Sequence, residues 1–154
     1  MMEKDDFDLQ DFLPYLLNRA AEEASLGFQQ YYKSRYGMLR NEWRVLFHLG
    51  CYGRMTAKDI GDRAKIHKTK ISRAVAKLSE RRFVVRQRDM QDRRSEHLEL
   101  TAQGKAAYRD LCQQAALYDQ RLAAPFSTEE REILRVALKK LAGIATGAEP
   151  GTSQ

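Results

Sequence analysis

Residues 54–77 contain side chains with the chemistry of polyanion binding. The densest part of this set is Lys68, Thr69, Lys70, Ser72, Arg73 and Lys77, and it is preceded by Arg54 and Lys58. Ammonium and guanidinium groups bind phosphates and the acceptor edges of bases, and hydroxyl groups hydrogen bond to either. We interpret Arg54, Lys58, Lys65 and Lys77 as phosphate contacts that position the protein, and the others as candidates for reading bases.

The local charge balance supports this interpretation. Residues 54–94 hold 14 Lys and Arg against 5 Asp and Glu, whereas the rest of the chain, which has a net charge of +6 overall, holds 13 against 16. Positive charge concentrated on one segment is typical of proteins that bind polyanions. The alternative is the solvated face of an ordinary basic protein, but it does not explain why capping residues, helical periodicity and a hairpin pattern coincide with the charge.

Two predicted helices position these side chains. Thr56 and Asp59 have the spacing of a capping box and predict the start of a short helix. In a second helix at 68–81, Ile71, Val75 and Leu78 recur at the spacing of a buried stripe, with basic residues on the other side. A helix that is basic at its exposed start has the properties of a recognition helix in the DNA major groove.

A two-stranded β-hairpin is predicted next. Residues 83–88 and 97–101 alternate in polarity with a period of two, and the loop between them holds Asp92, Arg93 and Arg94. An arginine-bearing loop beside a recognition helix can reach a narrow minor groove, where the negative potential is enhanced. The order of elements predicts a winged helix-turn-helix over residues 41–101.

Amphipathic helices flank this unit. Apolar residues at intervals of three and four predict helices at 11–33, capped by Asp11, and at 41–49, ended by the segment that begins at Gly50. Two further helices occupy 102–145, and Ser127 and Glu130 form a capping box for the last one. We expect the helix at 11–33 and the two helices in 102–145 to carry more apolar surface than a small winged domain can cover. Leaving such surface in water is unfavourable.

We therefore expect a homodimer in which the terminal helices at 11–33 and 102–145 intertwine. A twofold protein suits a palindromic operator in double-stranded DNA. The expected fold is mostly α with a small β-hairpin wing, of the α+β class. We expect one domain over residues 1–145 and a disordered tail at 146–154.

Other functional classes have less support in the sequence. The acidic start and the lack of an apolar run of ~18 residues predict a cytoplasmic, nucleoid-associated protein without a membrane partner. No Gly-rich phosphate loop or activated nucleophile is present, so we predict no enzyme, no catalytic residue and no cofactor. His48 and Cys51 could share a helix face, but no carboxylate cluster completes a metal site.

The two cysteines, Cys51 and Cys112, lack a Cys-x-x-Cys spacing and are interpreted as small, half-buried apolar residues. The alternative is a redox-sensing thiol, which would require an exposed and electropositive setting.

Several short motifs, in order, resemble the MarR family of bacterial transcriptional regulators. They are Glu42-Trp43-x-Val45-Leu46, Thr56-x-x-Asp59-Ile60, Ile71-Ser72-Arg73-x-Val75, Asp92-Arg93-Arg94 and Leu100-Thr101-x-x-Gly104. The resemblance extends over about residues 10–145 and implies an intertwined dimer with winged domains, most often a repressor released by a small ligand or an oxidant. By position, Lys68, Thr69, Lys70 and Arg73 match the family's recognition-helix contacts, Arg94 matches its wing-tip arginine, and Asp92 matches the residue that orients that arginine.

Two positions depart from the family pattern. Leu39 stands where a Thr or Ser usually caps the helix predicted at 41–49, which makes Asn41 the alternative cap. Arg82 stands where Gly usually follows the recognition helix. A residue other than Gly at this position must avoid the left-handed conformation or bear a strain of roughly 1 kcal/mol.

The resemblance also implies an effector pocket lined by the helices at 11–33 and 41–49 and by the first of the two helices in 102–145. The candidates are Tyr15, Arg19, Trp43 and His48, because an aromatic wall beside an arginine suits a small aromatic carboxylate. The alternative is that Trp43 and His48 pack between helices and Arg19 is solvated. Two further alternatives are an oxidant-responsive regulator that uses Cys51 or Cys112, and a constitutive regulator without a ligand.

Overall fold

The computed structural model of the chain describes residues 6–88, 90–91 and 96–145. The predicted tail at 146–154 and the wing residues Asp92, Arg93 and Arg94 lie outside the described residues. The chain divides into two compact units, Met1–Ala115 and Ala116–Gln154. The prediction of a single domain over residues 1–145 stays a prediction.

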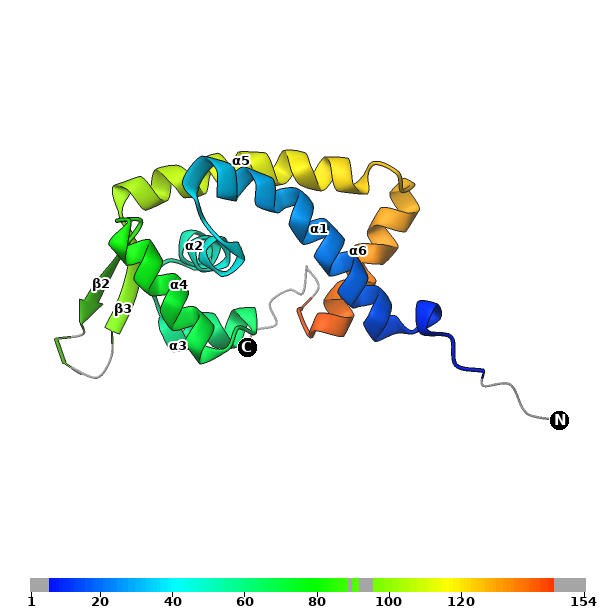
Figure 1. Cartoon of the computed structure of the whole chain (residues 1–154), viewed down its shortest axis with the longest axis horizontal. Helices are drawn as coiled ribbons and strands as arrows, with labels where there is room; N and C mark the ends of the chain where they lie inside the picture. Colours follow the sequence, from blue (N-terminus) through cyan, green and yellow to red (C-terminus); the bar gives the residue numbers. More distant parts are fainter. Residues whose placement is uncertain (1–5, 89, 92–95, 146–154) are drawn as a thin grey trace, which may run out of the picture. The chain divides into compact units, whose positions relative to one another are not determined.

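The first unit contains most of the elements (Figure 1). Its helical elements are η1 (Leu9–Asp11), α1 (Leu13–Tyr36), α2 (Arg40–Tyr52), α3 (Ala57–Ala64) and α4 (Lys68–Glu80), and its strands are β1 (Met55–Thr56), β2 (Val84–Arg88) and β3 (Glu96–Leu100). Helix α5 (Ala102–Ala123) begins in the first unit and ends in the second, which also contains α6 (Thr128–Ala142). The mostly α fold with a small wing is confirmed.

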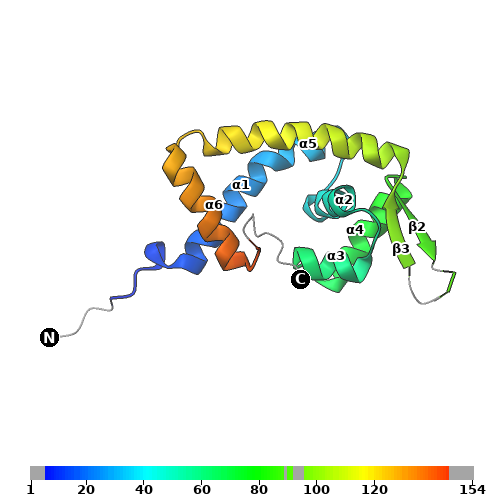
Figure 2. The same cartoon turned by 180° about the vertical axis from the view of Figure 1, so that it is seen from behind.

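The antiparallel sheet has the order β1-β3-β2. Strands β2 and β3 form the predicted hairpin (Figure 2). In its register, Val84 lies opposite Leu100 and Arg88 opposite Glu96. A third strand that was not predicted joins the hairpin, because Met55 and Thr56 pair with Leu98 and His97 of β3. This pairing fastens the segment that enters α3 to the base of the wing.

The core of the first unit is built from side chains of its helices and of its sheet. Its fully buried side chains include Tyr32, Met38, Val45, Leu46, Ile60, Leu98 and Leu111. Helix α4 packs against both α2 and α3, and α2 also contacts β3. Helix α4 is therefore held by apolar contacts on the side that faces away from solvent.

Two predicted helix starts were wrong. Asp11 does not cap the first helix; Asp8 caps η1, its Oδ1 accepting from the Gln10 N–H at 3.0 Å, and α1 follows at Leu13 without a side-chain cap. Asn41 does not cap the second helix. Leu39 precedes α2, and its N–H donates to the Glu42 carboxylate at 3.1 Å, with Glu42 itself buried.

Two predicted helix ends were also too early. Helix α1 continues to Tyr36, where Gly37 adopts the left-handed conformation with φ 64°. Helix α2 continues through Gly50 to Tyr52. Inside this helix, Gly50 leaves room for the ring of Tyr108, which lies directly against it. A Cβ at Gly50 would be 2.3 Å from Tyr108 Cδ1.

The second unit confirms the second capping box. The Ser127 hydroxyl accepts from the Glu130 N–H at 3.1 Å, and the Glu130 carboxylate accepts from the Ser127 N–H at 2.9 Å. None of the described residues of α6 is buried. In the described parts of the chain, no helix combines the length and apolar character that a membrane crossing requires.

Candidate nucleic-acid interface

Helix α3 and the following turn set the start of α4. The predicted capping box is confirmed: the Thr56 hydroxyl accepts from the Asp59 N–H at 3.0 Å, and the Asp59 carboxylate accepts from the Thr56 N–H at 3.4 Å. The turn begins at Lys65, which has a left-handed backbone with φ 58°. His67 then caps α4, since its Nδ1 accepts from the Thr69 N–H at 3.2 Å. This capping role of His67 was not predicted.

Helix α4 has one buried and one exposed side. The predicted stripe is confirmed, with Ile71, Val75 and Leu78 only 2%, 3% and 1% exposed. All six candidates on this helix are exposed: Lys68, Thr69, Lys70, Ser72, Arg73 and Lys77. Within the described part of the chain, none of the four cations among them forms an ion pair. Their charge is therefore not neutralised by a carboxylate from the described part of the chain.

Arg54 and Lys58 differ from the α4 cations because each has a carboxylate partner. Arg54 Nε lies 3.7 Å from Glu99 Oε2, and Lys58 Nζ lies 3.1 Å from Asp62 Oδ2. All four side chains are substantially exposed, and exposed ion pairs contribute little stability. A phosphate could replace either carboxylate at low cost.

The base of the wing is attached to α5. Arg82 adopts the left-handed conformation with φ 67°, so the chain bears the roughly 1 kcal/mol of strain expected for a residue other than Gly. The Thr101 hydroxyl donates to the Arg82 carbonyl at 2.7 Å and accepts from the Gly104 N–H at 3.0 Å, which caps α5. Gly104 allows the start of α5 to approach the Phe83 backbone, since a Cβ there would lie 2.1 Å from the Phe83 carbonyl oxygen.

Polar contacts also connect the far end of α4 to α1 and α5. Arg81 donates hydrogen bonds to the carbonyls of Tyr36 and Gly37. The Tyr36 hydroxyl donates to Asp110 Oδ2 at 2.5 Å, and Arg35 Nε lies 3.3 Å from the same oxygen. Burial, followed by the hydrogen bond and charge of Asp110, raises the pKa of Tyr36 to about 12. Tyr36 therefore keeps its proton at neutral pH and remains a donor to Asp110.

The four predicted effector residues make separate local contacts in the single chain. Arg19 donates to the Tyr15 hydroxyl at 3.2 Å on the exposed side of α1. Trp43 instead packs edge-on against Phe28, with ring centroids 5.4 Å apart. His48 Nδ1 lies 2.7 Å from the Arg44 carbonyl, within α2. Tyr15 and Arg19 thus form one pair, and the two α2 residues make separate contacts.

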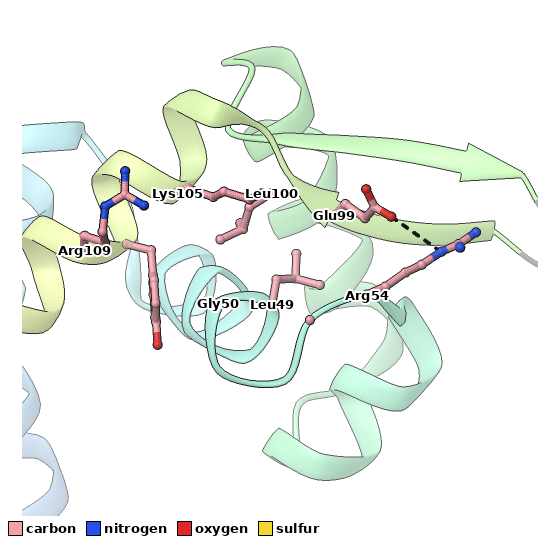
Figure 3. Close-up of a pocket in the computed structure, with 9 residues that line it drawn as sticks. Leu49, Gly50, Arg54, Glu99, Leu100, Lys105 and Arg109 are labelled. Atoms are coloured by element: carbon pink, nitrogen blue, oxygen red, sulfur yellow. Dashed lines mark ion pairs between the residues drawn. The ribbon is translucent and has the colours of Figure 1, made fainter.

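A different cavity of about 500 Å³ lies between the end of α2, β3 and the start of α5 (Figure 3). Leu49 and Leu100 form apolar parts of its wall, and its polar lining residues are Arg54, Glu99, Lys105 and Arg109, with Tyr108 beside them. Cations outnumber carboxylates in this lining, so the cavity has the chemistry to hold a small anion. The sequence did not predict it, because its residues come from three elements that are distant along the chain.

Comparisons with known proteins agree with this geometry. Residues 36–95 match the model of the MarR family. Over 97 residues the chain is 27% identical to YwoH, an uncharacterized HTH-type transcriptional regulator of Bacillus subtilis (strain 168), a match covering 63% of this chain and 70% of that protein.

Two solved structures show the same fold. BpsR of Bordetella bronchiseptica, described for the regulation of its DNA binding by 6-hydroxynicotinic acid, gives a TM-score of 0.81 at 20% identity, covering 92% of this chain and 100% of BpsR. The S. aureus MepR–DNA complex gives a TM-score of 0.76 at 21% identity, covering 86% and 96%. The chain is thus similar to the MarR family of transcriptional regulators over residues 36–95, and it shares the fold of solved regulators of DNA binding.

Proposed function

We propose that the protein is a homodimeric repressor that recognises a palindromic operator through α4 and is released by a small aromatic acid. The observation that carries this proposal is the exposed row of cations on α4, none of which pairs with a carboxylate in the described parts of the chain. Lys68, Thr69, Lys70, Ser72 and Arg73, near the start of the helix, read base edges. Lys77, Arg54 and Lys58 hold phosphates and fix the register.

The wing supplies the second set of DNA contacts. Arg94 enters the minor groove, Asp92 orients it, and Arg93 adds positive charge beside the backbone. Strands β2 and β3 lead into the segment that holds these three residues. Arg86 supports the hairpin from α4, because its Nε lies 3.4 Å from Ser79 Oγ.

Dimerisation is supported by the apolar side chains that the single chain leaves in solvent. Leu13 of α1 is 60% exposed, and Ile133 and Leu141 of α6 are 61% and 60% exposed. Such surface is covered in soluble proteins when a partner is present. The terminal helices at 11–33 and 102–145 form this interface and, with the winged unit, make residues 1–145 one functional domain.

Two places are candidates for the effector. The first consists of Tyr15, Arg19, Trp43 and His48, and requires that these residues be brought together on dimerisation. The second is the cavity in Figure 3, where Arg54, Lys105 and Arg109 suit a carboxylate and the leucines suit a ring. Regulation of BpsR by 6-hydroxynicotinic acid, an aromatic acid, supports this chemical class of ligand.

The DNA part is tested by footprinting the protein on the DNA upstream of its own gene. We expect protection of a site with twofold symmetry, and Arg94→Ala should weaken that protection while light scattering still shows a dimer. Unchanged protection by Arg94→Ala would mean that the wing does not reach DNA. A monomer of the unmodified protein in light scattering would remove the basis for a palindromic site.

The effector part is tested with a panel of aromatic acids and the fluorescence of Trp43, the only tryptophan. An acid that lifts the footprint should also change this fluorescence. Weaker binding in Arg109→Ala assigns the acid to the cavity, and weaker binding in Arg19→Ala assigns it to the pocket on α1 and α2. If no acid changes the footprint, the protein is a constitutive regulator with respect to this class.

A further inference from the structure

One arginine joins the end of α4 to the end of α1. Arg81 is the residue at which α4 ends, and its guanidinium donates to the Tyr36 carbonyl and, at 3.0 Å, to the Gly37 carbonyl. Both carbonyls lie at the C-terminal end of α1, where a helix leaves carbonyl groups without partners inside the helix. A cation at this end also meets the negative end of the helix dipole, so Arg81 binds α1 through hydrogen bonds and through charge.

The backbone of α1 makes room for the Arg81 side chain. Gly37 ends α1 with a left-handed backbone at φ 64°, and a Cβ at this position would lie 2.9 Å from Arg81 Nη2. A larger residue there would be strained by its own backbone and would push the guanidinium away. On the other side, the guanidinium carbon lies 5.7 Å from the centre of the Phe83 ring. The guanidinium is thus held between a glycine and an aromatic ring.

Helix α5 takes part in the same contacts. The Tyr36 hydroxyl donates to Asp110 of α5, and the Tyr36 ring meets Phe83 edge-on with centroids 6.1 Å apart. The side-chain amide of Gln103, also on α5, donates to the Arg81 carbonyl at 3.4 Å. We name Arg81, Tyr36 and Asp110 the Arg81 junction. It connects the ends of α1 and α4 to α5.

The junction links parts of the chain that suit different partners. Helix α4 packs against α2 and α3 with its apolar stripe, and its exposed side carries the proposed DNA contacts. Helices α1 and α5 expose apolar side chains such as Leu13 and Leu117, which suit a second copy of the chain. Arg81 therefore lies between the helix that would read DNA and the helices that would join two copies.

We propose that Arg81 is a positioning residue for operator recognition, which sets the direction of α4 relative to α1 and thereby the half-site spacing that the dimer accepts. This inference rests on the proposed function, because only a dimer on a palindrome has a spacing to read. A firmly held α4 fits one spacing, whereas an α4 that can turn fits several and loses more freedom on binding. In this role the guanidinium binds α1 and not DNA, unlike the cations of α4.

The experiment compares Arg81→Met with the unmodified, full-length protein on operators of different spacing. Methionine keeps an apolar contact with Phe83 but cannot donate a hydrogen bond. On the operator defined by footprinting, the variant should bind about tenfold more weakly, as expected when the coupling between two elements is lost. On operators with one central base pair added or removed, the variant should bind within about threefold of the unmodified protein. Its preference for one spacing should therefore be smaller.

Two other roles of Arg81 predict different results, and either of them would overturn the proposal. If Arg81 contacted a phosphate, the loss would be equal on all spacings, and the salt dependence of binding would become shallower by about one. If Arg81 only stabilised the fold, the loss would again be equal on all spacings, with an unchanged salt dependence. Arg81→Lys keeps the charge and a donor and should restore part of the spacing preference. Glu80→Ala, at the neighbouring exposed position, is the control and should keep the full preference.

A measurement without DNA tests the junction itself. Amide hydrogen exchange should be several-fold faster in Arg81→Met at residues 37–38 and 82–83, whose N–H groups donate to the last turns of α1 and α4. Tyr36→Phe keeps the ring against Phe83 but removes the bond to Asp110, and it should accelerate exchange at the end of α1 by a smaller factor.

Faster exchange confined to residues 82–83 in Arg81→Met would show that the two helix ends are not joined, and it would overturn the proposal. If the unmodified protein binds no operator, the proposed function fails. The exchange measurement would still show in that case whether Arg81 joins the two helix ends.

Discussion

Helices α4 and α6 carry the same apolar periodicity and have opposite surroundings. In α4 the stripe of Ile71, Val75 and Leu78 is at most 3% exposed, because α2 and α3 cover it within the same chain. In α6 the corresponding stripe includes Leu134 and Leu138, which are 44% and 41% exposed. Periodicity therefore shows that a helix has a face to bury, whereas the partner that buries it depends on the rest of the assembly.

The exposed sides of these two helices suit different binding partners. On α4 the exposed side is cationic and suits DNA, and on α6 the exposed side is apolar and suits a second copy of the chain. A charged surface of the first kind is stable in water without a ligand, but an apolar surface of the second kind is not. We therefore expect substitutions in α6 to affect assembly, and substitutions on the exposed side of α4 to affect only DNA binding.

The largest effect is expected for Leu138→Asp in α6. A carboxylate placed in a dimer interface loses its hydration without gaining a partner, which costs several kcal/mol and splits or unfolds the dimer. Light scattering and the dependence of the melting temperature on protein concentration measure this effect. Lys139→Asp, which puts the same group on the neighbouring residue, is the control and should remain a dimer. A dimer that survives Leu138→Asp would show that this face is not the interface.

The next largest effect is expected for Ile71→Ala on the buried side of α4. Removing a buried branched side chain leaves a cavity and should lower the free energy of unfolding by about 2–5 kcal/mol. Denaturant titration measures this change. Ser72→Ala, on the adjacent exposed residue, should change it by no more than about 0.5 kcal/mol. Equal losses in both variants would mean that the two sides of α4 are not distinguished as described.

Arg73→Ala on the exposed side of α4 should leave stability unchanged and weaken operator binding by about 1–3 kcal/mol. The loss should be larger on the operator than on unrelated DNA, because a residue that reads bases contributes little to nonspecific binding. Glu80→Ala, at the other end of the exposed helix, is the control. Parallel losses on both DNAs would make Arg73 a phosphate contact.

The smallest effect is expected for Arg82→Gly between α4 and the wing. Glycine adopts the left-handed conformation at φ 67° without the penalty of a side chain, so the variant should gain up to about 1 kcal/mol of stability. Arg88→Gly, within strand β2, should lose stability. A loss for Arg82→Gly similar to that for Arg88→Gly would mean that contacts of the Arg82 side chain outweigh the strain.

The local parts of the fold could be predicted from the sequence. The capping boxes that begin at Thr56 and Ser127 formed as expected, because each depends on two residues three positions apart. The start of α2 could not be predicted in the same way. There a buried carboxylate, Glu42, binds the Leu39 N–H, and the burial arises from tertiary packing.

Contacts between distant residues were the parts that sequence patterns missed. Strand β1 has only two residues and forms because β3, about forty positions later, offers an unpaired edge. The cavity with Arg54 and Arg109 and the contact between Cys51 and Tyr108 likewise join α2 to α5. The proposed DNA contacts at Asp92, Arg93 and Arg94 were deduced from a motif, and they stay a prediction.

The central claim, that the protein binds DNA through the positive charge of α4, the wing and the residues beside them, is tested most directly by the salt dependence of operator binding. The logarithm of the affinity should fall linearly with the logarithm of the salt concentration, with a slope of about −0.9 for each phosphate neutralised. Lys77→Ala, which removes one proposed phosphate contact, should make the slope shallower by about one. An affinity that does not change with salt would contradict the account.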